Sequence, residues 1–234
     1  MTSKPKKVFI TGVAGFIGSY VAHSLLDQGV EIIGVDNLND YYLPRLKQMR
    51  LERLTARRGF AFHNMDIADH EALLGLEAAK GVEVIVHLAA QAGVRYSLEN
   101  PFAYAASNLT GHLSILELVR HAPERPRLVY ASSSSVYGAN TKAPFSEKDP
   151  VTQPVSLYAA TKRADELMSE AYARLYGVEQ IGLRFFTVYG PWGRPDMAYW
   201  SFTENILSGK PIRVFNDGDN IIDISEIAHH IAVV

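Results

Sequence analysis

The sequence predicts an α/β fold with a doubly wound parallel sheet. Short apolar segments alternate along the chain with longer segments whose apolar residues recur at helical spacing. The short segments are apolar at nearly every position, which is typical of parallel strands covered by helices on both faces. Right-handed connections between such strands place the helices on both sides of one sheet.

The expected strands are compact apolar runs, and their length is that of a strand rather than of a helix. In chain order they are Lys7–Thr11, Glu31–Asp36, Ala61–Met65, Val82–Leu88, Arg127–Ala131 and Glu179–Phe185.

The expected helices are longer and amphipathic, and they occupy the gaps between the strands. In chain order they are Phe16–Gln28, Pro44–Arg57, Asp69–Ala79, Phe102–His121, Ser156–Tyr176 and Tyr199–Leu207. Gly29 ends the first helix because glycine readily takes the left-handed position after a helix. Gly138–Pro154, rich in Pro, Lys, Ser and Asp, is expected to form a surface loop, and the alternating pattern loosens beyond Gly190.

Composition excludes several classes of function. The chain has 234 residues, enough for one large domain or for one domain and part of a second. Its formal net charge of −2 gives no electrostatic reason to bind nucleic acid or an anionic membrane. Cysteine is absent, which excludes disulfides and thiolate catalysis. No apolar run reaches the ~18 residues of a membrane span, and we expect a soluble cytoplasmic protein.

A glycine-rich turn joins the first strand to the first helix. Its spacing, G-x-x-G-x-x-G, puts Gly12 in the tight turn, Gly15 where the backbone approaches a pyrophosphate, and Gly18 where helix and strand pack closely. Phe16 and Ile17 open the helix, whose free N–H groups would face the phosphates. The alternative, an ordinary strand–helix turn, is disfavoured by an acidic residue at the end of the second strand.

That acidic residue, Asp36, indicates the cofactor. Its carboxylate can accept hydrogen bonds from the adenosine ribose and would repel a 2′-phosphate, so NAD is favoured over NADP. Further cofactor contacts are expected beside Asp36 and where the third and fourth strands end, although packing alone would explain the same residues. These candidates are Asn37, Asp66, Ile67, Leu88, Ala89 and Ala90.

A tyrosine and a lysine four residues apart suggest general acid–base chemistry. Tyr158 and Lys162 share one face of an expected helix, so both can point into one cleft. The lysine charge favours a phenolate that removes a proton from a substrate hydroxyl. Such a pair alone is a common accident on amphipathic helices. The serine run Ser132–Ser135 after the fifth strand either adds hydroxyls to the same edge of the sheet or forms a polar turn.

Together these motifs resemble the extended short-chain dehydrogenase/reductase family of NAD-dependent epimerases and dehydratases, and within it the UDP-glucuronate 4-epimerases. The resemblance spans about Lys7 to Gly218. It rests on the segments Gly12–Ser19, Asp36–Tyr42, His87–Arg95, Ser132–Gly138, Tyr158–Lys162, Arg184–Pro191 and Gly193–Met197. It implies a Rossmann-fold isomerase of carbohydrate metabolism that uses NAD to epimerise a UDP-uronate through a transient 4-keto sugar.

The resemblance also implies roles for individual residues. Tyr158 would be the base, Lys162 its partner, and Ser133 a hydrogen-bond partner of the oxygen at C4. The same comparison puts Asn108 near the cofactor and Phe186 beside the nicotinamide. Ser134, Ser135 and Thr187 are expected near the C6 group of the sugar. Arg95 and Arg194 are candidates for the carboxylate or the diphosphate, and surface charge is an open alternative for both.

Two serines favour epimerisation over the elimination reactions of related enzymes. Ser134 and Ser135 stand where 4,6-dehydratases carry an acidic pair and where UDP-glucuronate decarboxylases carry an acid. With no acid there, elimination is disfavoured, and neutral hydroxyls suit a carboxylate that must be retained.

The resemblance weakens toward the C-terminus. Relatives continue past Gly218 with Arg-Asp-Phe-Thr and then Tyr-Ile-Asp-Asp-Ile, which Asp223–Ile227 only faintly echoes. We therefore expect an NAD-binding domain with the catalytic residues at 1–190 and an incomplete C-terminal substrate lobe at 191–234. His229–His230 is interpreted as part of the tail, and no metal site is expected.

Three functions remain open from the sequence. The first is epimerisation between UDP-glucuronate and UDP-galacturonate, and the second is a truncated NAD-binding module without epimerase activity. The third is another nucleotide-sugar dehydratase or reductase of the same superfamily.

A homodimer is expected from the same resemblance. In relatives the helices that correspond to Phe102–His121 and Ser156–Tyr176 form a four-helix contact. Leu113, Leu116 and Leu167 would fit such a contact as well as they fit an ordinary core.

Overall fold

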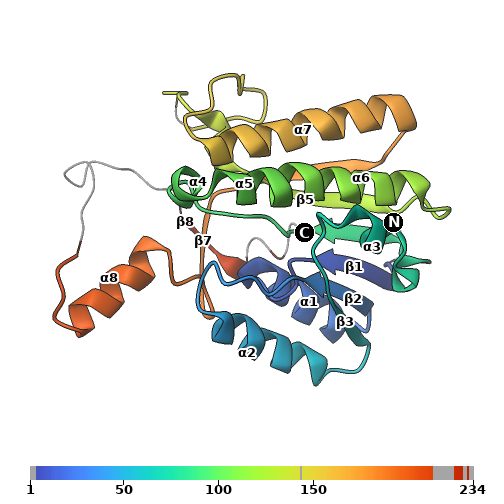
Figure 1. Ribbon diagram of the computed structural model, residues 1–234, viewed down its shortest axis with the longest axis horizontal. Helices are drawn as coiled ribbons and strands as arrows, with labels where there is room; N and C mark the ends of the chain where they lie inside the picture. Colours follow the sequence, from blue (N-terminus) through green and yellow to red (C-terminus); the bar gives the residue numbers. More distant parts are fainter. Residues whose placement is uncertain (1–3, 143, 213–223, 229–230, 232–234) are drawn as a thin grey trace.

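The computed structural model describes residues 4–142, 144–212, 224–228 and 231. At its centre lies a six-stranded sheet in the order β3-β2-β1-β4-β5-β6, and every neighbouring pair is parallel (Figure 1). The strands are β1 (Lys7–Thr11), β2 (Glu31–Asp36), β3 (Phe60–Asn64), β4 (Val84–His87), β5 (Arg127–Ser133) and β6 (Gln180–Phe185). The doubly wound parallel sheet expected from the sequence is confirmed.

Helices cover both faces of this sheet. On one side lie α1 (Phe16–Asp27) and α2 (Pro44–Thr55), and on the other α3 (His70–Leu74), α6 (Gly111–His121) and α7 (Leu157–Tyr176) (Figure 1). The short helices α4 (Tyr96–Glu99) and α5 (Pro101–Tyr104) precede α6. Helix α8 (Ala198–Leu207) projects away from the sheet at the left of Figure 1, and none of its residues is buried.

Alternate side chains of β1 enter two separate apolar cores. Val8 and Ile10 pack in one core with Leu54 of α2, whereas Phe9 packs in the other with Leu128 of β5. A strand sends successive side chains to opposite faces, so two cores require helices on both sides. The near-continuous apolar runs in the sequence have this cause.

The strand order reverses beside β1. The chain passes from β1 outward through β2 and β3, and then returns to place β4 on the other side of β1. The connections that leave β1 and β4 therefore diverge at the carboxyl edge of the sheet. Folds of this kind bind their ligands in the crevice at that point.

The long helix expected at Phe102–His121 is interrupted. Helix α5 is followed by a π-helical turn, Ala105–Thr110, before α6 begins at Gly111. This turn holds Asn108, which is only 1% exposed and hydrogen-bonds the backbone of Gln91. An apolar period does not reveal one extra residue in a helical turn, and such turns often accompany functional sites.

Other departures from expectation are local. The helix expected at Asp69–Ala79 is α3 followed by a separate 3₁₀ turn, Glu77–Ala79, because α3 ends at Gly75. Strands β7 (Thr187–Tyr189) and β8 (Ile224–Glu226) form an unexpected two-stranded parallel sheet. Residues 213–223 and His229–His230 lie outside the described residues, so the expectations about them stay predictions.

The expected apolar face of α6 and α7 is smaller than the sequence suggests. Leu113 and Leu167 are exposed, but Leu116 is completely buried in the core under the sheet. Of the two alternatives that the sequence left open for Leu116, a helix contact between protomers or the ordinary core, the structure shows the core. Leu116 lies three residues from Leu113 and one from Ile115, and helical spacing alone does not say where the core ends.

Two buried histidines lie between the sheet and α6. Thr11 Oγ1 and His87 Nδ1 are 2.7 Å apart, His112 Nε2 and Ser169 Oγ are 2.8 Å apart, and the two imidazole rings are tilted with their centroids 5.3 Å apart. Burial lowers the pKa of His112 to about 3 and that of His87 well below its usual value. Both imidazoles are therefore neutral in the folded protein near neutral pH.

We expect acid to destabilise the parent chain more than the His112→Asn variant. His112 in the unfolded chain takes up a proton near about pH 6.5, whereas the folded protein resists until about pH 3. Between these values the unfolded state binds more protons. The free energy of unfolding therefore falls by up to about 1.4 kcal/mol for each unit by which the pH is lowered.

Urea unfolding between about pH 7 and about pH 5 measures this effect. Asp165, whose pKa burial raises to about 6, acts in the opposite direction in both proteins, so the parent-minus-variant difference isolates His112. A difference that does not change with pH would contradict the assignment.

Candidate active site

One cleft lies at the carboxyl edge of the sheet, where the strand order reverses. Its volume is about 390 Å³. The turns after β1, β2, β3, β4 and β5 all contribute walls, together with the start of α7 and the chain from Phe185 to Met197. Most of the sequence-derived site residues line it: Gly12, Gly15, Phe16, Ile17, Gly18, Asp36, Asn37, Asp66, Ile67, Leu88, Ala89, Ala90, Ser133, Ser134, Ser135, Tyr158, Lys162, Phe186, Thr187 and Arg194.

The glycine-rich turn forms a cradle in which side chains would not fit. Gly12 has a φ of +70°, and a Cβ there would lie 2.7 Å from the backbone nitrogen of Ala89. A Cβ on Gly18 would lie 2.1 Å from the carbonyl oxygen of Gly12, and one on Gly15 would lie 2.9 Å from the same oxygen. The turn therefore presents bare backbone to the cleft beside the N-terminus of α1, which suits a diphosphate.

Asp36 is fixed at the end of β2 by backbone donors. Its Oδ2 accepts a hydrogen bond from Ala14 N at 3.1 Å and its Oδ1 accepts one from Leu38 N at 2.9 Å. The side chain is nearly buried, and burial raises its pKa above the usual value. A carboxylate oxygen accepts more than one hydrogen bond, so Asp36 keeps capacity for ligand hydroxyls. Nearby, Asn37 Nδ2 donates to Asp66 Oδ2 at 3.0 Å.

Tyr158 and Lys162 enter the cleft from the first turns of α7. The helix begins after Ser156, whose Oγ accepts a hydrogen bond from Ala159 N at 3.0 Å and so caps the helix. Lys162 is 3% exposed and donates to Ala131 O at 3.0 Å and to Asp165 Oδ2 at 3.1 Å. An ammonium has three N–H bonds, so one donor remains for a ligand. Asp165, missed by the sequence interpretation, supplies the counter-charge.

The serines after β5 form a compact 3₁₀ turn. Ser133 Oγ accepts a hydrogen bond from Ser135 N at 3.2 Å and donates to Ser135 Oγ at 3.1 Å. Ser132 Oγ instead donates to Glu166 Oε1 at 2.7 Å, which ties the turn to α7. The neutral hydroxyls of Ser133, Ser134 and Ser135 therefore face the same cleft as Tyr158.

Asn108 supports the site from behind. Its Oδ1 accepts from Gln91 N at 2.8 Å, and its Nδ2 donates to Gln91 O and to Thr161 Oγ1 at 3.1 and 2.9 Å. It thereby joins the chain after β4 to α7, and it is not among the lining residues. Asn108 therefore lies behind Gln91, which lines the cleft, and its expected place near the cofactor stays a prediction.

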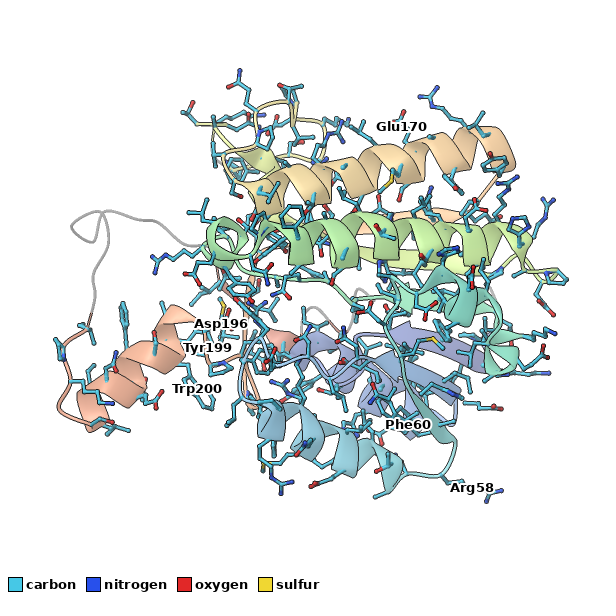
Figure 2. The ribbon with its side chains drawn as sticks, in the orientation of Figure 1. Arg58, Phe60, Glu170, Asp196, Tyr199 and Trp200 are labelled. Atoms are coloured by element: carbon cyan, nitrogen blue, oxygen red, sulfur yellow. The ribbon has the colours of Figure 1, made fainter. Side chains whose placement is uncertain are left out.

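The two candidate arginines differ in position. Arg194 lines the cleft and forms a two-bond fork with Asp196, and Tyr41 Oη donates to Asp196 Oδ2 at 3.1 Å. Figure 2 labels Asp196 at the foot of α8. Arg95 is exposed before α4 and does not line the cleft. The expectation that Arg95 faces the ligand is therefore not supported, because the turn into α4 carries it outward.

Several lining residues were not among the sequence candidates. They come from the loop after β2, from α2, from the chain after β4 and from the start of α8, and include Asn39, Tyr41, Tyr42, Lys47, Gln91, Ala92, Gly93, Val94 and Met197. A Cβ on Gly93 would lie 2.3 Å from Tyr41 Oη, so these two segments meet across the cleft. The tyrosines beside Asp36 and the small residues after His87 were visible in the sequence, but no local pattern brings them together.

The described residues show neither a metal centre nor a membrane-spanning helix. Within the described ranges, no group of three or more His, Asp or Glu side chains is placed to hold a metal ion. No helix in that part of the chain is long and apolar enough to cross a membrane.

Comparisons with known proteins agree with this geometry. The chain is 50% identical over 218 residues to UDP-glucuronate 4-epimerase 1 of Arabidopsis thaliana, covering 93% of this chain and 50% of that protein. It is 50% identical over 221 residues to Protein CapI of Staphylococcus aureus, covering 94% and 66%. The chain thus spans about half the length of the plant relative and about two thirds of the bacterial one.

Solved structures give the same picture. UDP-glucuronic acid 4-epimerase from Bacillus cereus, in complex with UDP-glucuronic acid and NAD, superposes with a TM-score of 0.86 at 33% identity, covering 96% of this chain and 70% of that one. DesIV, a dTDP-glucose 4,6-dehydratase from Streptomyces venezuelae, superposes with a TM-score of 0.88 at 29% identity, covering 97% and 70%.

A family model decides between a shared fold and a shared family. The model of the NAD dependent epimerase/dehydratase family matches residues 8–232, nearly the whole chain. With the glycine cradle, Asp36 and the Tyr158–Lys162 pair all in one cleft, the chain belongs to the NAD-dependent epimerase/dehydratase family.

Proposed function

We propose that this chain binds NAD in the cleft and carries out NAD-dependent 4-epimerisation of a UDP-uronate. The observation that carries the proposal is the meeting of the glycine cradle, the Tyr158–Lys162 pair and the neutral serines in one cleft. The relatives named UDP-glucuronate 4-epimerase support the choice of substrate.

The cradle fits a dinucleotide on its own geometry. Its three glycines leave room for a diphosphate against the backbone, and Asp36 stands where ribose hydroxyls would be held. The other proposed contacts are Asn37, Asp66, Ile67, Leu88, Ala89, Ala90, Phe186 and the Tyr158–Lys162 pair. When bound, NAD supplies the acceptor and donor of hydride at C4 of the sugar.

The protein's own groups handle the proton and the sugar. Tyr158 accepts the proton of the C4 hydroxyl as the transient 4-keto sugar forms. It returns the proton after the keto sugar has rotated to present its opposite face. Lys162, anchored by Ala131 O and Asp165, lies on the same face of α7 as Tyr158 and keeps one N–H donor for a ligand. Ser133 hydrogen-bonds the C4 oxygen and so holds this oxygen next to Tyr158.

The acid group of the sugar is bound by the turn after β5 and the chain from Thr187 to Arg194. Ser134, Ser135 and Thr187 offer neutral hydroxyls, and Arg194 offers a guanidinium already oriented by Asp196. Because neither serine can act as an acid or a base at neutral pH, elimination from the sugar ring is disfavoured. This argues against dehydratase chemistry despite the structural similarity to DesIV.

Two observations bear on a second candidate, an NAD-binding module without turnover. The chain covers 50 to 70% of the relatives compared above, and the apolar residues Ile206 and Leu207 of α8 are exposed. We propose that residues 1–190 form the NAD-binding domain and residues 191–234 part of a lobe that covers the sugar nucleotide. If more of that lobe is needed for uridine binding, this chain holds NAD alone.

Calorimetric titration of the NAD-loaded chain with UDP-glucuronate separates the two candidates. Binding followed by UDP-galacturonate in the product mixture, with no accumulation of NADH, supports the epimerase. If NAD stays bound but UDP-glucuronate gives no heat of binding, the epimerase is ruled out and the NAD-binding module remains.

Asp36→Asn is expected to weaken discrimination against NADP. The variant keeps a side chain of the same shape but loses the charge that repels a 2′-phosphate, so the ratio of NAD to NADP affinity should fall about 10-fold or more. Fluorescence titration with both cofactors measures the ratio, and Asp27→Asn, an exposed aspartate paired with Arg57, serves as the matched control. An unchanged ratio in Asp36→Asn would remove Asp36 from the cofactor site.

We also propose that the chain forms a homodimer through α6 and α7. Leu113 and Leu167 are 41% and 51% exposed on these helices, and Phe102 before them is 83% exposed. Light scattering at high protein concentration should give twice the chain mass, and Leu167→Glu should return it to the monomer mass. A monomer mass for the parent chain would end this proposal.

A further inference from the structure

Arg50 is the most deeply buried arginine side chain that the described part of the structure contains. It lies in α2, a helix rich in charged residues, yet it is only 1% exposed. Burying a guanidinium is costly unless its donors are paired. No carboxylate in the described residues lies within ion-pair distance of it, so its partners are all neutral oxygens.

Those neutral partners come from the glycine turn, from the loop after β2 and from the turn at residues 190–194. Arg50 Nη1 donates to Ala14 O in the glycine turn at 3.1 Å and to Tyr42 Oη at 2.7 Å. Its Nε donates to Trp192 O at 3.2 Å, and its Nη2 donates to Trp192 O and Gly193 O. One planar fork therefore spans the glycine turn and the turn at residues 190–194.

The turn at residues 190–194 depends on such a support. Trp192 has a φ of +63°, a left-handed conformation that a tryptophan adopts only when its surroundings hold it. The bonds from Arg50 to Trp192 O and Gly193 O fix the two peptide groups that immediately precede Arg194. Arg194 then lines the cleft.

The glycine turn is linked to the ribose-side carboxylate through the same residue. Ala14 N donates to Asp36 while Ala14 O accepts from Arg50. A continuous set of hydrogen bonds thus runs from Asp36 through Ala14 and Arg50 to the backbone before Arg194.

We propose that Arg50 is a positioning residue that couples the cofactor loop to Arg194, so that loading the glycine turn fixes the guanidinium that receives an acidic sugar. The inference rests on the proposed function, because it assigns a ligand to each wall. The coupling acts through the backbone of Trp192 and Gly193, and Arg50 itself touches neither ligand.

Hydrogen–deuterium exchange of the chain with and without NAD tests the coupling. In the parent, NAD should slow exchange both in the glycine turn, 12–19, and in the turn at 190–194. In Arg50→Met, NAD should still protect 12–19 but no longer protect 190–194. Equal protection of 190–194 in the parent and in Arg50→Met would overturn the inference, whereas no protection of 12–19 in the parent would remove the proposed function itself.

Two further variants separate positioning from folding. Arg53→Met removes a neighbouring exposed arginine that lies over the Trp192 ring at 4.9 Å but makes no bond to the turn's backbone, and it should behave as the parent. Arg50→Lys keeps the charge but not the fork, and it should lose the NAD response at 190–194 as Arg50→Met does. A parent-like response in Arg50→Lys would show that the positive charge alone suffices. It would overturn the proposal that the guanidinium fork carries the coupling.

The sugar supplies an independent readout. Arg50→Met should lower affinity for UDP-glucuronate about 10-fold relative to UDP-glucose, because a small displacement of Arg194 affects only the ligand with an acid group. A purely structural role would lower both affinities together, and that result would contradict the proposal.

Discussion

Replacing Tyr158 by phenylalanine is expected to reduce epimerisation by about 10³-fold or more while leaving NAD bound. The phenyl ring fills the same space at the start of α7, so the cleft keeps its shape. Only the hydroxyl that exchanges the C4 proton is lost. Turnover is measured by chromatography of the UDP-uronates, and NAD by its release from the denatured protein.

Tyr172→Phe is the matched control for this prediction. Tyr172 lies on the same helix, but its hydroxyl bonds Glu117, and burial with that carboxylate raises its pKa to about 12. It does not line the cleft, so its loss should leave turnover within about 2-fold of the parent. If Tyr158→Phe retained a tenth of the parent rate or more, Tyr158 would not be the base.

Gly12→Ala is expected to abolish NAD binding. Alanine at this position must adopt a φ of +70° and place its Cβ 2.7 Å from Ala89 N and 2.9 Å from the carbonyl carbon of Leu88. Both neighbours are backbone atoms, so they cannot turn aside as a side chain could. The turn must move, and NAD affinity measured by calorimetry should fall about 100-fold or more.

Gly29→Ala separates the clash from the backbone strain. Gly29 has a similar φ of +77°, but nothing lies within 4 Å of a Cβ there. Its substitution should cost about 1 to 2 kcal/mol of unfolding free energy and leave NAD affinity unchanged. Thermal unfolding of both variants checks that Gly12→Ala is folded when its affinity is measured. NAD affinity near the parent value in folded Gly12→Ala would show that the cradle does not hold the cofactor.

The sequence was informative wherever a feature depends on neighbouring residues. The strands and most helices lie within a few residues of their expected bounds, because burial on two faces imposes a local apolar pattern. The glycine turn and the pair Tyr158 and Lys162 were also local, since a tight turn and one helix face need only seven and five consecutive residues.

Features that depend on contacts between distant segments were not accessible in this way. The π-helical turn brings Asn108 to Gln91 and Thr161, and nothing in the local apolar period announces it. Arg50 lies in a helix whose composition indicates a solvated surface, and its burial follows from the turn at residues 190–194, which packs over it. For Leu116 the sequence left the core and a helix contact as alternatives, because its burial depends on the elements that pack against α6.

The most direct test of the central claim uses UDP-glucuronate carrying deuterium at C4. The purified chain is loaded with NAD and incubated with this substrate. The sugars are then analysed by mass spectrometry and proton NMR spectroscopy. The proposed function predicts UDP-galacturonate that keeps its deuterium at C4, with no net NADH, because the same hydride leaves and returns within one cleft. Deuterium lost from the product, a product of altered mass, or no product while NAD stays bound would contradict it.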